Sequence, residues 1–378
     1  MAKIPLVFLA MIFLLLGGCR ANEAPKASQS SFCAIIVSDL HFTTHDQSAS
    51  AIPLMQINVE ATKAFLDQVI DMRPDALLIT GDNTNSGFKE DEEALAQLLQ
   101  KVKDAGIAIV MTTGNHDMDH GDAKQYKQIF FSLLEADEVD EASLSYATII
   151  GDVMLLAMDD NSDDRMVARF SRETMDWLER IMDKYPEKRK IFLSHRSVLK
   201  ISDSDRYQID NPQLLRMLKK RGVRLCFSGH THSQAHLQDG SLHEIVSAIP
   251  WSGAHLFGVL EIADGHVSYA TQSIDFDKHG SADMAQEVHR LDEEADQAMR
   301  AMFANVLEEE LAQEGVELVM RFFTAYSNGS IALAQDEILS DPCYGAVMEK
   351  LQDTNYGPWM KSLVETRQLR ADVLEFDE

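Results

Sequence analysis

The chain has 378 residues, of which 34 are Lys or Arg and 61 are Asp or Glu, so its formal net charge at pH 7 is −27. A hydrophobic content of 45% and a charged content of 25% are those of an ordinary globular protein, which argues against disordered, collagen-like and coiled-coil chains. Nucleic acids and acidic lipid surfaces are polyanions, so the charge argues against electrostatic binding to either, but it allows a small phosphate-bearing ligand wherever local cations neutralise the site.

The N-terminus carries the pattern of a secretion signal. Lys3 precedes an apolar run over residues 4–16, which is shorter than the ~20 residues of a membrane-spanning helix and fits the core of a signal peptide. Gly17 and Gly18 before Cys19 resemble a bacterial lipobox, in which the cysteine is lipidated. We therefore predict a lipoprotein signal peptide at 1–18, a flexible tether at 19–31 and an extracytoplasmic protein anchored to the bacterial cell membrane through Cys19. A membrane helix over the apolar run is the alternative.

From residue 32 onward, short apolar runs alternate with amphipathic segments. The predicted strands are 32–38, 76–80, 107–112, 153–158, 190–194 and 223–228. The predicted helices are 57–72, 91–105, 123–134, 172–185 and 212–221. This alternation predicts an α/β fold in which a mostly parallel or mixed sheet is covered by helices.

The pattern changes after residue 229. Short strands are predicted at 236–237, 242–247, 256–263 and 267–273, with hairpin turns at Asp239-Gly240 and Asp264-Gly265. From residue 282 the composition becomes rich in Ala, Glu, Leu and Met, which predicts helices at 284–314, 316–327 and 359–373. We place a boundary near residue 277, between an α/β domain at 32–277 and a mostly helical C-terminal domain at 278–378.

Five of the predicted strands end in residues that commonly bind metals. In chain order these residues are Asp39 and His41, Asp82, Asn115 with His116 and Asp117, His195, and His230 with His232. One such cluster is more often an ordinary loop, but five in succession are not expected by chance. Open α/β sheets bind their ligands at this carboxyl end of the strands.

The residue types indicate what the site would hold. Carboxylate, amide oxygen and imidazole together suit Mn, Fe or Zn ions better than Ca²⁺, which prefers oxygen alone. Without His116 and Asp117, seven ligands remain, which are too many for one ion and fit two ions that share a carboxylate, for which Asp82 is the natural candidate. Two ions roughly 3.5–4 Å apart clamp a phosphoryl group and activate a water, and they supply local positive charge in an acidic protein.

The order of the motifs, written DxH, GD, GNHD, H and GHTH, resembles the calcineurin-like metallophosphoesterase superfamily over residues 32–273. Residues 194–234 and the helical C-terminus are similar to the bacterial class III cyclic-nucleotide phosphodiesterase-like branch. The resemblance implies a two-sheet α/β/β/α sandwich followed by a mostly helical C-terminal domain. Residues 81–88 lack the arginine that Ser/Thr protein phosphatases of the superfamily usually carry, which argues against that activity.

The resemblance also implies a role for each motif residue. One ion would be held by Asp39, His41, Asp82 and His232, and the other by Asp82, Asn115, His195 and His230. His116 would contact the substrate, either stabilising the phosphoryl charge or protonating the leaving oxygen, and Asp117 would orient the His116 imidazole. A hydroxide bridging the two ions would attack phosphorus in line.

Three further features each have more than one interpretation. Arg196 would either neutralise a substrate phosphate or cap its own loop. Tyr207 lies in a polar insertion at 201–210, which would be either a lid that stacks on the substrate or an ordinary loop. The acidic segment 159–164 could touch substrate or bind Ca²⁺, but a solvated turn is the preferred interpretation because the segment lacks the Gly and terminal Glu of a calcium loop.

The leading hypothesis is a binuclear metal-dependent phosphodiesterase that hydrolyses a small phosphodiester, for which a cyclic nucleotide is one candidate. A phosphomonoesterase or nucleotidase using the same metals is the alternative. A non-catalytic metal- or solute-binding lipoprotein is a third hypothesis, and the complete ligand set with His116 argues against it. The expected partners are a small phosphate ester and, through Cys19 alone, the membrane, without binding of a nucleic-acid polymer.

Overall fold

The computed structural model describes residues 31–161, 168–200, 208–311 and 313–377. Within these ranges the strands form two sheets. The six-stranded sheet has the order β13-β12-β11-β1-β2-β3, and the seven-stranded sheet has the order β4-β5-β6-β7-β8-β10-β9. The predictions for the signal peptide, for Cys19 and for Tyr207 fall outside the described residues, as does nearly all of the tether.

The strand bounds agree closely with the sequence pattern. In the six-stranded sheet they are β1 Phe32–Val37, β2 Ala76–Thr80, β3 Ala108–Thr112, β11 Leu256–Ala263, β12 His266–Ser273 and β13 Val373–Asp377. In the seven-stranded sheet they are β4 Glu138–Val139, β5 Tyr146–Ile150, β6 Val153–Ala157, β7 Arg189–Leu193, β8 Leu225–Ser228, β9 Ala235–Asp239 and β10 Leu242–Val246. The sequence analysis missed β4, β5 and β13.

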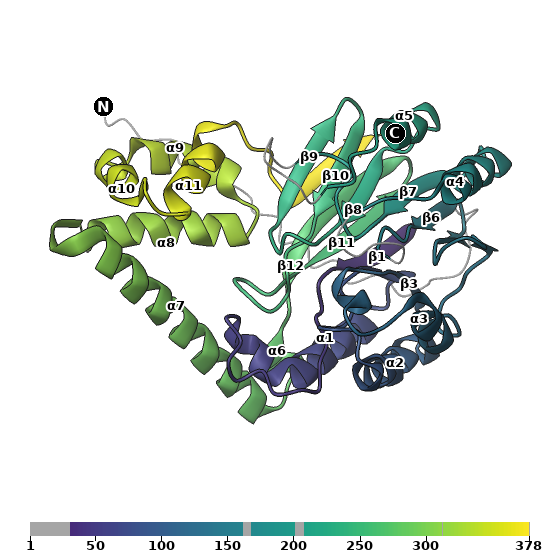
Figure 1. Ribbon diagram of the computed structural model, residues 1–378, viewed down its shortest axis with the longest axis horizontal. Helices are drawn as coiled ribbons and strands as arrows, with labels where there is room; N and C mark the ends of the chain where they lie inside the picture. Colours follow the sequence, from purple (N-terminus) through teal and green to yellow (C-terminus); the bar gives the residue numbers. More distant parts are fainter. Residues whose placement is uncertain (1–30, 162–167, 201–207, 312, 378) are drawn as a thin grey trace, which may run out of the picture.

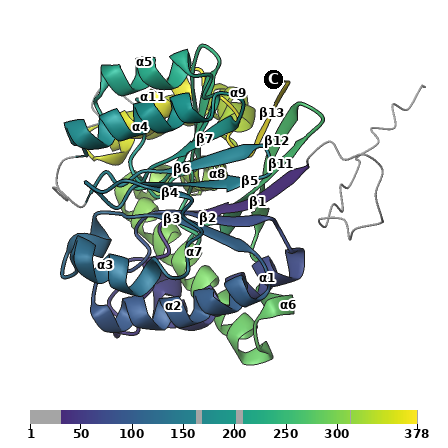
Figure 2. The ribbon, with the colours of Figure 1, turned by 90° about the vertical axis from the view of Figure 1, so that its right-hand side faces the viewer.

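Helices cover the outer face of each sheet, so the α/β/β/α expectation is confirmed (Figure 2). Along the six-stranded sheet lie α1 Asn58–Met72, α2 Lys89–Asp104 and α3 Ala123–Phe130. Along the seven-stranded sheet lie α4 Arg172–Lys184 and α5 Pro212–Lys220. The predicted start of α5 is confirmed, because the Asn211 side chain accepts hydrogen bonds from the backbone N–H groups of Gln213 and Leu214.

The alternation of side chains along the strands places the cores. In β7, Ile191 and Leu193 belong to the core between the sheets, whereas Phe192 belongs to the core beneath α4 and α5. This is the two-residue period of a strand that is buried on both faces. The predicted turn between β11 and β12 is also confirmed, because Asp264 and Gly265 both have positive φ (56° and 80°), as the tightest hairpin turns require.

The C-terminal helices form a second part of the molecule, called here the helical part. It consists of α8 Glu314–Ser327, α9 Ile331–Ser340, α10 Tyr344–Leu351 and α11 Tyr356–Glu365. The short helix α6 (Phe276–His279) and the long helix α7 (Ala282–Leu311) lead to it from the α/β part (Figure 1). The helical part has its own hydrophobic core, to which Phe303 of α7 and Phe322 of α8 contribute.

The end of the chain differs from the predicted helix over 359–373. Helix α11 ends at Glu365, and Val373–Asp377 form β13, which pairs antiparallel with β12. The alternating pattern of residues 373–377 (VLEFD) suits an edge strand, and β12 offers the unpaired backbone that a distant segment can join. The C-terminal region therefore leaves the α/β part and then returns to its sheet. Among the described residues, none of the helices has the length and apolar character to span a membrane.

Candidate metal centre

The predicted ligands meet where strands of the two sheets end. Asp39 and His41 follow β1, Asp82 follows β2 and Asn115 follows β3 in one sheet. His195 follows β7, and His230 and His232 follow β8, in the other sheet. Because these strands run parallel within each sheet, their carboxyl ends lie on one edge, and the two edges face each other.

One group of possible ligands consists of Asp39, His41, Asp82 and His232, and their donor atoms all lie within 4.8 Å of one another. The Nε2 atoms of His41 and His232 are 3.0 Å apart. The His41 Nε2 is also 3.6 Å from Oδ2 of Asp82, and the His232 Nε2 is 3.5 Å from Oδ1 of Asp39. Imidazole nitrogens and carboxylate oxygens at this spacing converge on one point, as the ligands of a metal ion do.

A second group consists of Asp82, His195 and His230. The Nε2 of His195 lies 3.3 Å from Oδ2 of Asp82 and 3.2 Å from Nδ1 of His230. The same nitrogen is 3.2 Å from Oδ1 of Asn115, which adds an amide oxygen to the group. Asp82 therefore belongs to both groups, in the position of a carboxylate shared by two ions.

The other ring nitrogen of His195 fixes how its imidazole is presented. Nδ1 lies 2.9 Å from the carbonyl oxygen of Thr80. A carbonyl can only accept, so Nδ1 donates the hydrogen bond and Nε2 is left to bind an ion.

The backbone at the ligands is strained. Among the described residues, nine that are not glycine have positive φ, and five of the nine are candidate ligands. These five are Asp39, His41, Asp82, His230 and His232. Such conformations cost of order 1–3 kcal/mol each and persist where function requires them. Their concentration here marks the site independently of any motif.

The glycines in the motifs are explained by close contact with neighbouring ligands. A Cβ atom at Gly81 would lie 2.6 Å from Nδ1 of His195. A Cβ at Gly229 would overlap the side chains of Ser38 and Asp39, and one at Gly114 would overlap the backbone and carboxylate of Asp82. Each glycine therefore leaves the space that a ligand from another loop occupies.

The electrostatics of the site favour a cation. Burial raises the pKa of Asp39, but the hydrogen bond and charge of His232 outweigh burial and bring that pKa down to about 2. Burial lowers the pKa of His195, but the charges of Asp82 and Asp39 outweigh it and raise that pKa to about 10. The carboxylates of Asp82 and Asp39 thus favour the protonated, positively charged form of His195. Bound metal ions can supply this positive charge in place of the proton. The donor types, their convergence and their charge fit two divalent ions.

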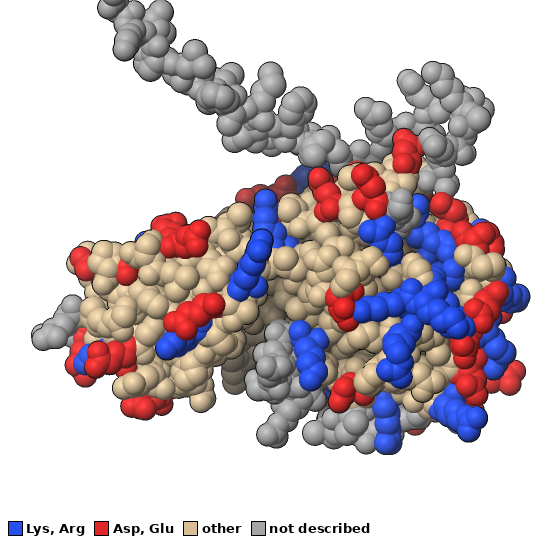
Figure 3. Space-filling view, turned by 90° about the horizontal axis from the view of Figure 1, so that it is seen from above, with Lys and Arg blue, Asp and Glu red and all other residues tan. Residues whose placement is uncertain are grey.

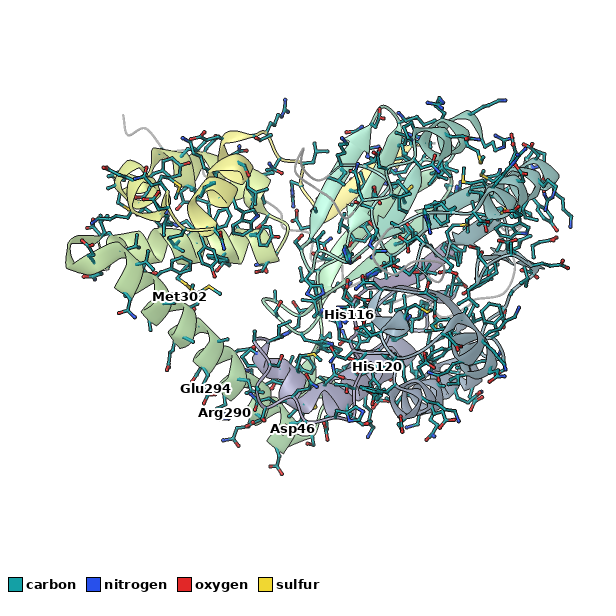
Figure 4. All side chains as sticks on the ribbon, in the orientation of Figure 1. Asp46, His116, His120, Arg290, Glu294 and Met302 are labelled. Carbon is teal, nitrogen blue, oxygen red and sulfur yellow. The ribbon has the colours of Figure 1, made fainter. Side chains whose placement is uncertain are left out.

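His116 stands at the open side of this centre. Its imidazole packs edge-on against His41 with ring centroids 4.7 Å apart, and 39% of its side chain is exposed. Its Nδ1 is 3.0 Å from the carbonyl oxygen of Asn85 and 3.3 Å from a carboxylate oxygen of Asp119. Figure 4 shows His116 and His120 on the side of the α/β part that faces α7.

Asp117 does not orient His116 as expected. Its buried carboxylate accepts hydrogen bonds from the backbone of Asn83, Thr84 and Gly114 and from the side chains of the first two. Consecutive side chains in a helical turn do not face each other, so Asp117 points inward while His116 points outward. Asp117 instead ties the loop after β2 to the loop after β3. The carbonyl of Asn85 takes the orienting role, and a backbone carbonyl leaves no mark in sequence.

The acidic segment after β6 is not a solvated turn in the part that the structure describes. Asp159, Asp160 and Asn161 are 5%, 1% and 1% exposed, respectively. Arg196 is also buried and donates to two of them: its backbone N–H to Asp160 and its guanidinium to Asn161. These contacts favour the loop-holding interpretation of Arg196.

Two residues that support the ligand loops were missed. The indole N–H of the buried Trp251 donates to the carbonyl oxygen of Leu40, which lies between Asp39 and His41. The buried carboxylate of Glu244 in β10 accepts from the backbone N–H groups of residues 198 and 199. Neither residue has a local sequence signal, because each contacts its partner only through the tertiary fold.

The fold and the site define a class, that of two-sheet α/β proteins with a candidate binuclear metal centre between the ends of the strands. A family model described as calcineurin-like phosphoesterase matches residues 34–234, more than half of the chain, and the chain belongs to that family. A protein of Arcobacter nitrofigilis named a probable glycerophosphodiester phosphodiesterase GpdQ is 24% identical over 201 residues, which cover 50% of this chain and 69% of that protein.

Solved structures with a similar fold include a plant protein and a bacterial protein. A purple acid phosphatase from yellow lupin, Lupinus luteus, is 12% identical with a TM-score of 0.45, covering 65% of this chain and 52% of that one. A 5'-nucleotidase precursor from Thermus thermophilus is 13% identical with a TM-score of 0.42, covering 71% of this chain and 60% of that one.

Proposed function

We propose that the protein is a binuclear metal-dependent phosphodiesterase acting on a small phosphodiester. The observation that carries the proposal is that Asp82 belongs to both donor groups while the partly exposed His116 stands beside them. Manganese, iron and zinc are the ions that this mixture of imidazole, carboxylate and amide would hold.

Bound ions would clamp the phosphoryl group and supply a nucleophile at neutral pH. The side chains of the two donor groups would hold them, and Asp82 would hold both. The backbone N–H of His116 donates to Oδ1 of Asp82 at 2.8 Å, so the shared ligand and the His116 loop are fixed to each other. His116 would then give a proton to the leaving oxygen, while Asn85 and Asp119 keep its ring in place.

A diester is preferred as substrate because the A. nitrofigilis relative is named for a phosphodiesterase activity. A small one is preferred because the net charge of −27 repels polyanions. On the face in Figure 3, Lys and Arg side chains lie among Asp and Glu over the α/β part. Arg221, for example, is paired with Glu179 and Asp183. We therefore propose no binding of a nucleic-acid polymer.

The test is hydrolysis of a bis-aryl phosphodiester and of the matching aryl monoester by the chelated protein reloaded with Mn²⁺. We expect the diester to have the higher kcat/KM. A higher value for the monoester would replace the proposal with a phosphomonoesterase. No hydrolysis of either, with two ions bound, would favour a non-catalytic lipoprotein.

We also propose that Cys19 carries lipid and anchors the protein outside the cytoplasmic membrane. Phe32, the first residue of β1, lies at the opposite end of that strand from Asp39, so the predicted tether joins the α/β part away from the metal centre. Cys19→Ala should move the protein from the membrane fraction to the soluble fraction of the host. Membrane association that survives this change would overturn the anchor.

A further inference from the structure

The buried segment Asp159–Asn161 lies between two loops that carry ligands of the second group. It follows β6, which lies beside β7 in the seven-stranded sheet. All three side chains are polar and at most 5% exposed, although nothing in the proposed chemistry requires them. Buried polar groups are costly unless they are paired, so their partners indicate what the segment does.

One set of contacts reaches the loop after β7. The backbone N–H of Arg196 donates to Oδ2 of Asp160 at 3.0 Å, and the Arg196 guanidinium donates to Oδ1 of Asn161. Arg196 directly follows the candidate ligand His195, so the first bond fixes the peptide next to that ligand and the second fixes the side chain that follows it.

The other set reaches the loop after β3. The amide nitrogen of Asn161 donates to the carbonyl oxygen of Thr113 at 2.9 Å, and the Thr113 hydroxyl donates to Oδ1 of Asp159 at 2.6 Å. Thr113 lies two residues before Asn115. The second oxygen of Asp159 accepts from the backbone N–H of Leu144 at 3.1 Å, which ties the segment to the loop before β5.

The segment therefore joins the loops of Asn115 and His195, whose ligand atoms are 3.2 Å apart. The first donor group is held by other bonds: the N–H of Asp39 donates to the carbonyl of Gly81, and that of His41 to the carbonyl of Asp82. We propose that Asp160 and Asn161 are positioning residues that set the affinity of the ion bound by Asn115 and His195, separately from that of the other ion. This inference rests on the proposed binuclear function.

Asp160→Asn is the sharpest test, because it keeps the shape of the side chain. Both oxygens of Asp160 accept hydrogen bonds, from Arg196 and from Asn161, and an asparagine turns an N–H group toward one of these donors. Mn²⁺ titration of the chelated protein by calorimetry should show two ions in the wild type. In the variant we expect the affinity for the ion bound by Asn115 and His195 to be weakened about 10–100-fold, and the affinity for the other ion to be unchanged. This is the usual effect of removing a hydrogen-bonding residue that orients metal ligands without binding the metal.

The matched control is Asp140→Asn. Asp140 is also buried, and it accepts from the N–H of Ala142 and the hydroxyls of Ser143 and Thr174, none of which belongs to a loop that carries a candidate ligand. Asn161→Asp is the second variant, because it places an acceptor against the Thr113 carbonyl if Asp160→Asn does not fold. The control should bind both ions as the wild type does.

The outcomes separate this inference from the function on which it rests. Fewer than two ions in the wild type would overturn the binuclear proposal and the inference with it. Two ions in the wild type, with both affinities unchanged or equally reduced in Asp160→Asn and Asn161→Asp, would overturn the inference alone. Elemental analysis after gel filtration should give the same stoichiometries without relying on activity.

Discussion

Five candidate ligands adopt left-handed backbone angles, so single residues at this site are placed at a cost to folding. Hydrogen bonds between the loops hold them there, such as that from the N–H of His41 to the carbonyl of Asp82 at 2.9 Å. A metal ion that binds only the folded state stabilises that state and offsets part of this free-energy cost. The apoprotein should therefore be the less stable form.

Asp82→Ala is the change that should affect both ions. Asp82 is 1% exposed and belongs to both donor groups, so its removal takes a carboxylate from each. We expect fewer than two ions per chain and loss of hydrolysis, measured by elemental analysis and by the diester assay. Two ions bound to the variant would contradict the shared position of Asp82.

His116→Ala should separate binding from turnover. The His116 side chain belongs to neither donor group, so both ions should stay bound. Loss of a positioned proton donor typically lowers kcat about 10²–10⁴-fold. Unchanged kcat would exclude His116 from the chemistry, and loss of an ion would make it a ligand.

The candidate ligands could be predicted from the sequence because each motif follows a predicted strand, and the carboxyl ends of parallel strands meet at one edge of a sheet. The sequence indicates the wrong partner for Asp117, because adjacency in the chain does not tell which way a turn directs two side chains. It also fails for Asp160. A run of Asp and Asn suggests exposure, and its burial depends on Thr113 and Arg196, which are far away in the chain.

At the scale of elements, the first turn of α2 carries an unusual acid. Glu92 is fully buried, and its Oε1 has no hydrogen-bond partner among the described residues. Burial and the charge of Asp117 raise the pKa of Glu92 from 4.5 to about 8. The folded protein therefore keeps this proton at pH values where the unfolded chain has released it.

Glu92→Gln should change how stability depends on pH. Below pH 4.5, Glu92 is protonated in both the folded and the unfolded wild type, so it does not make the free energy of unfolding depend on pH. Between pH 4.5 and about 8 the unfolded chain gives up the proton first, so the free energy of unfolding falls as pH rises. The variant should lack this decrease in the free energy of unfolding. The Tm of the variant minus that of the wild type should therefore increase from pH 5 to pH 8. A difference in Tm that is constant with pH would contradict the raised pKa.

Elements were predictable where their pattern was long and local. The amphipathic helices α1 to α5 and the apolar strands next to them follow from periodicity. Strand β13 could not be predicted in this way. It is a segment of only five residues, and it forms a strand because the edge of β12 is available for pairing. Likewise β4 has only two residues, and its pairing with β5 defines it.

At the scale of the whole molecule, the helical part touches the α/β part next to the metal centre. Gly329 follows α8 with φ +65°, and a Cβ atom there would lie 2.5 Å from Cγ of Gln234 and 2.9 Å from Cβ of Ala371. Gln234 lies two residues after His232, and its amide nitrogen donates to the Ala371 carbonyl at 2.9 Å. The loop after β8 is thus fixed from the side of the helical part.

Gly329→Val should disturb this contact. The added side chain has no space, and positive φ is costly for a β-branched residue. We expect faster proteolysis between the two parts and a Tm lower by several degrees. Gly240→Val introduces the same backbone strain, because Gly240 also has φ +65°, but no atom lies within 4 Å of a Cβ added there, so it controls for strain without the contact. Equal effects of the two changes would show that packing at Gly329 does not matter.

The hydrogen bond from Trp251 to Leu40 gives the protein an intrinsic optical reporter. The chain has three tryptophans; Trp177 lies in the core beneath α4 and α5, and Trp359 packs against the core of the helical part. Only Trp251 contacts the peptide between two candidate ligands. A chain with Phe at positions 177 and 359 would therefore signal the arrival of an ion through the emission of one indole. Rapid mixing of such a chain with Mn²⁺ would time the filling of the centre without any dye.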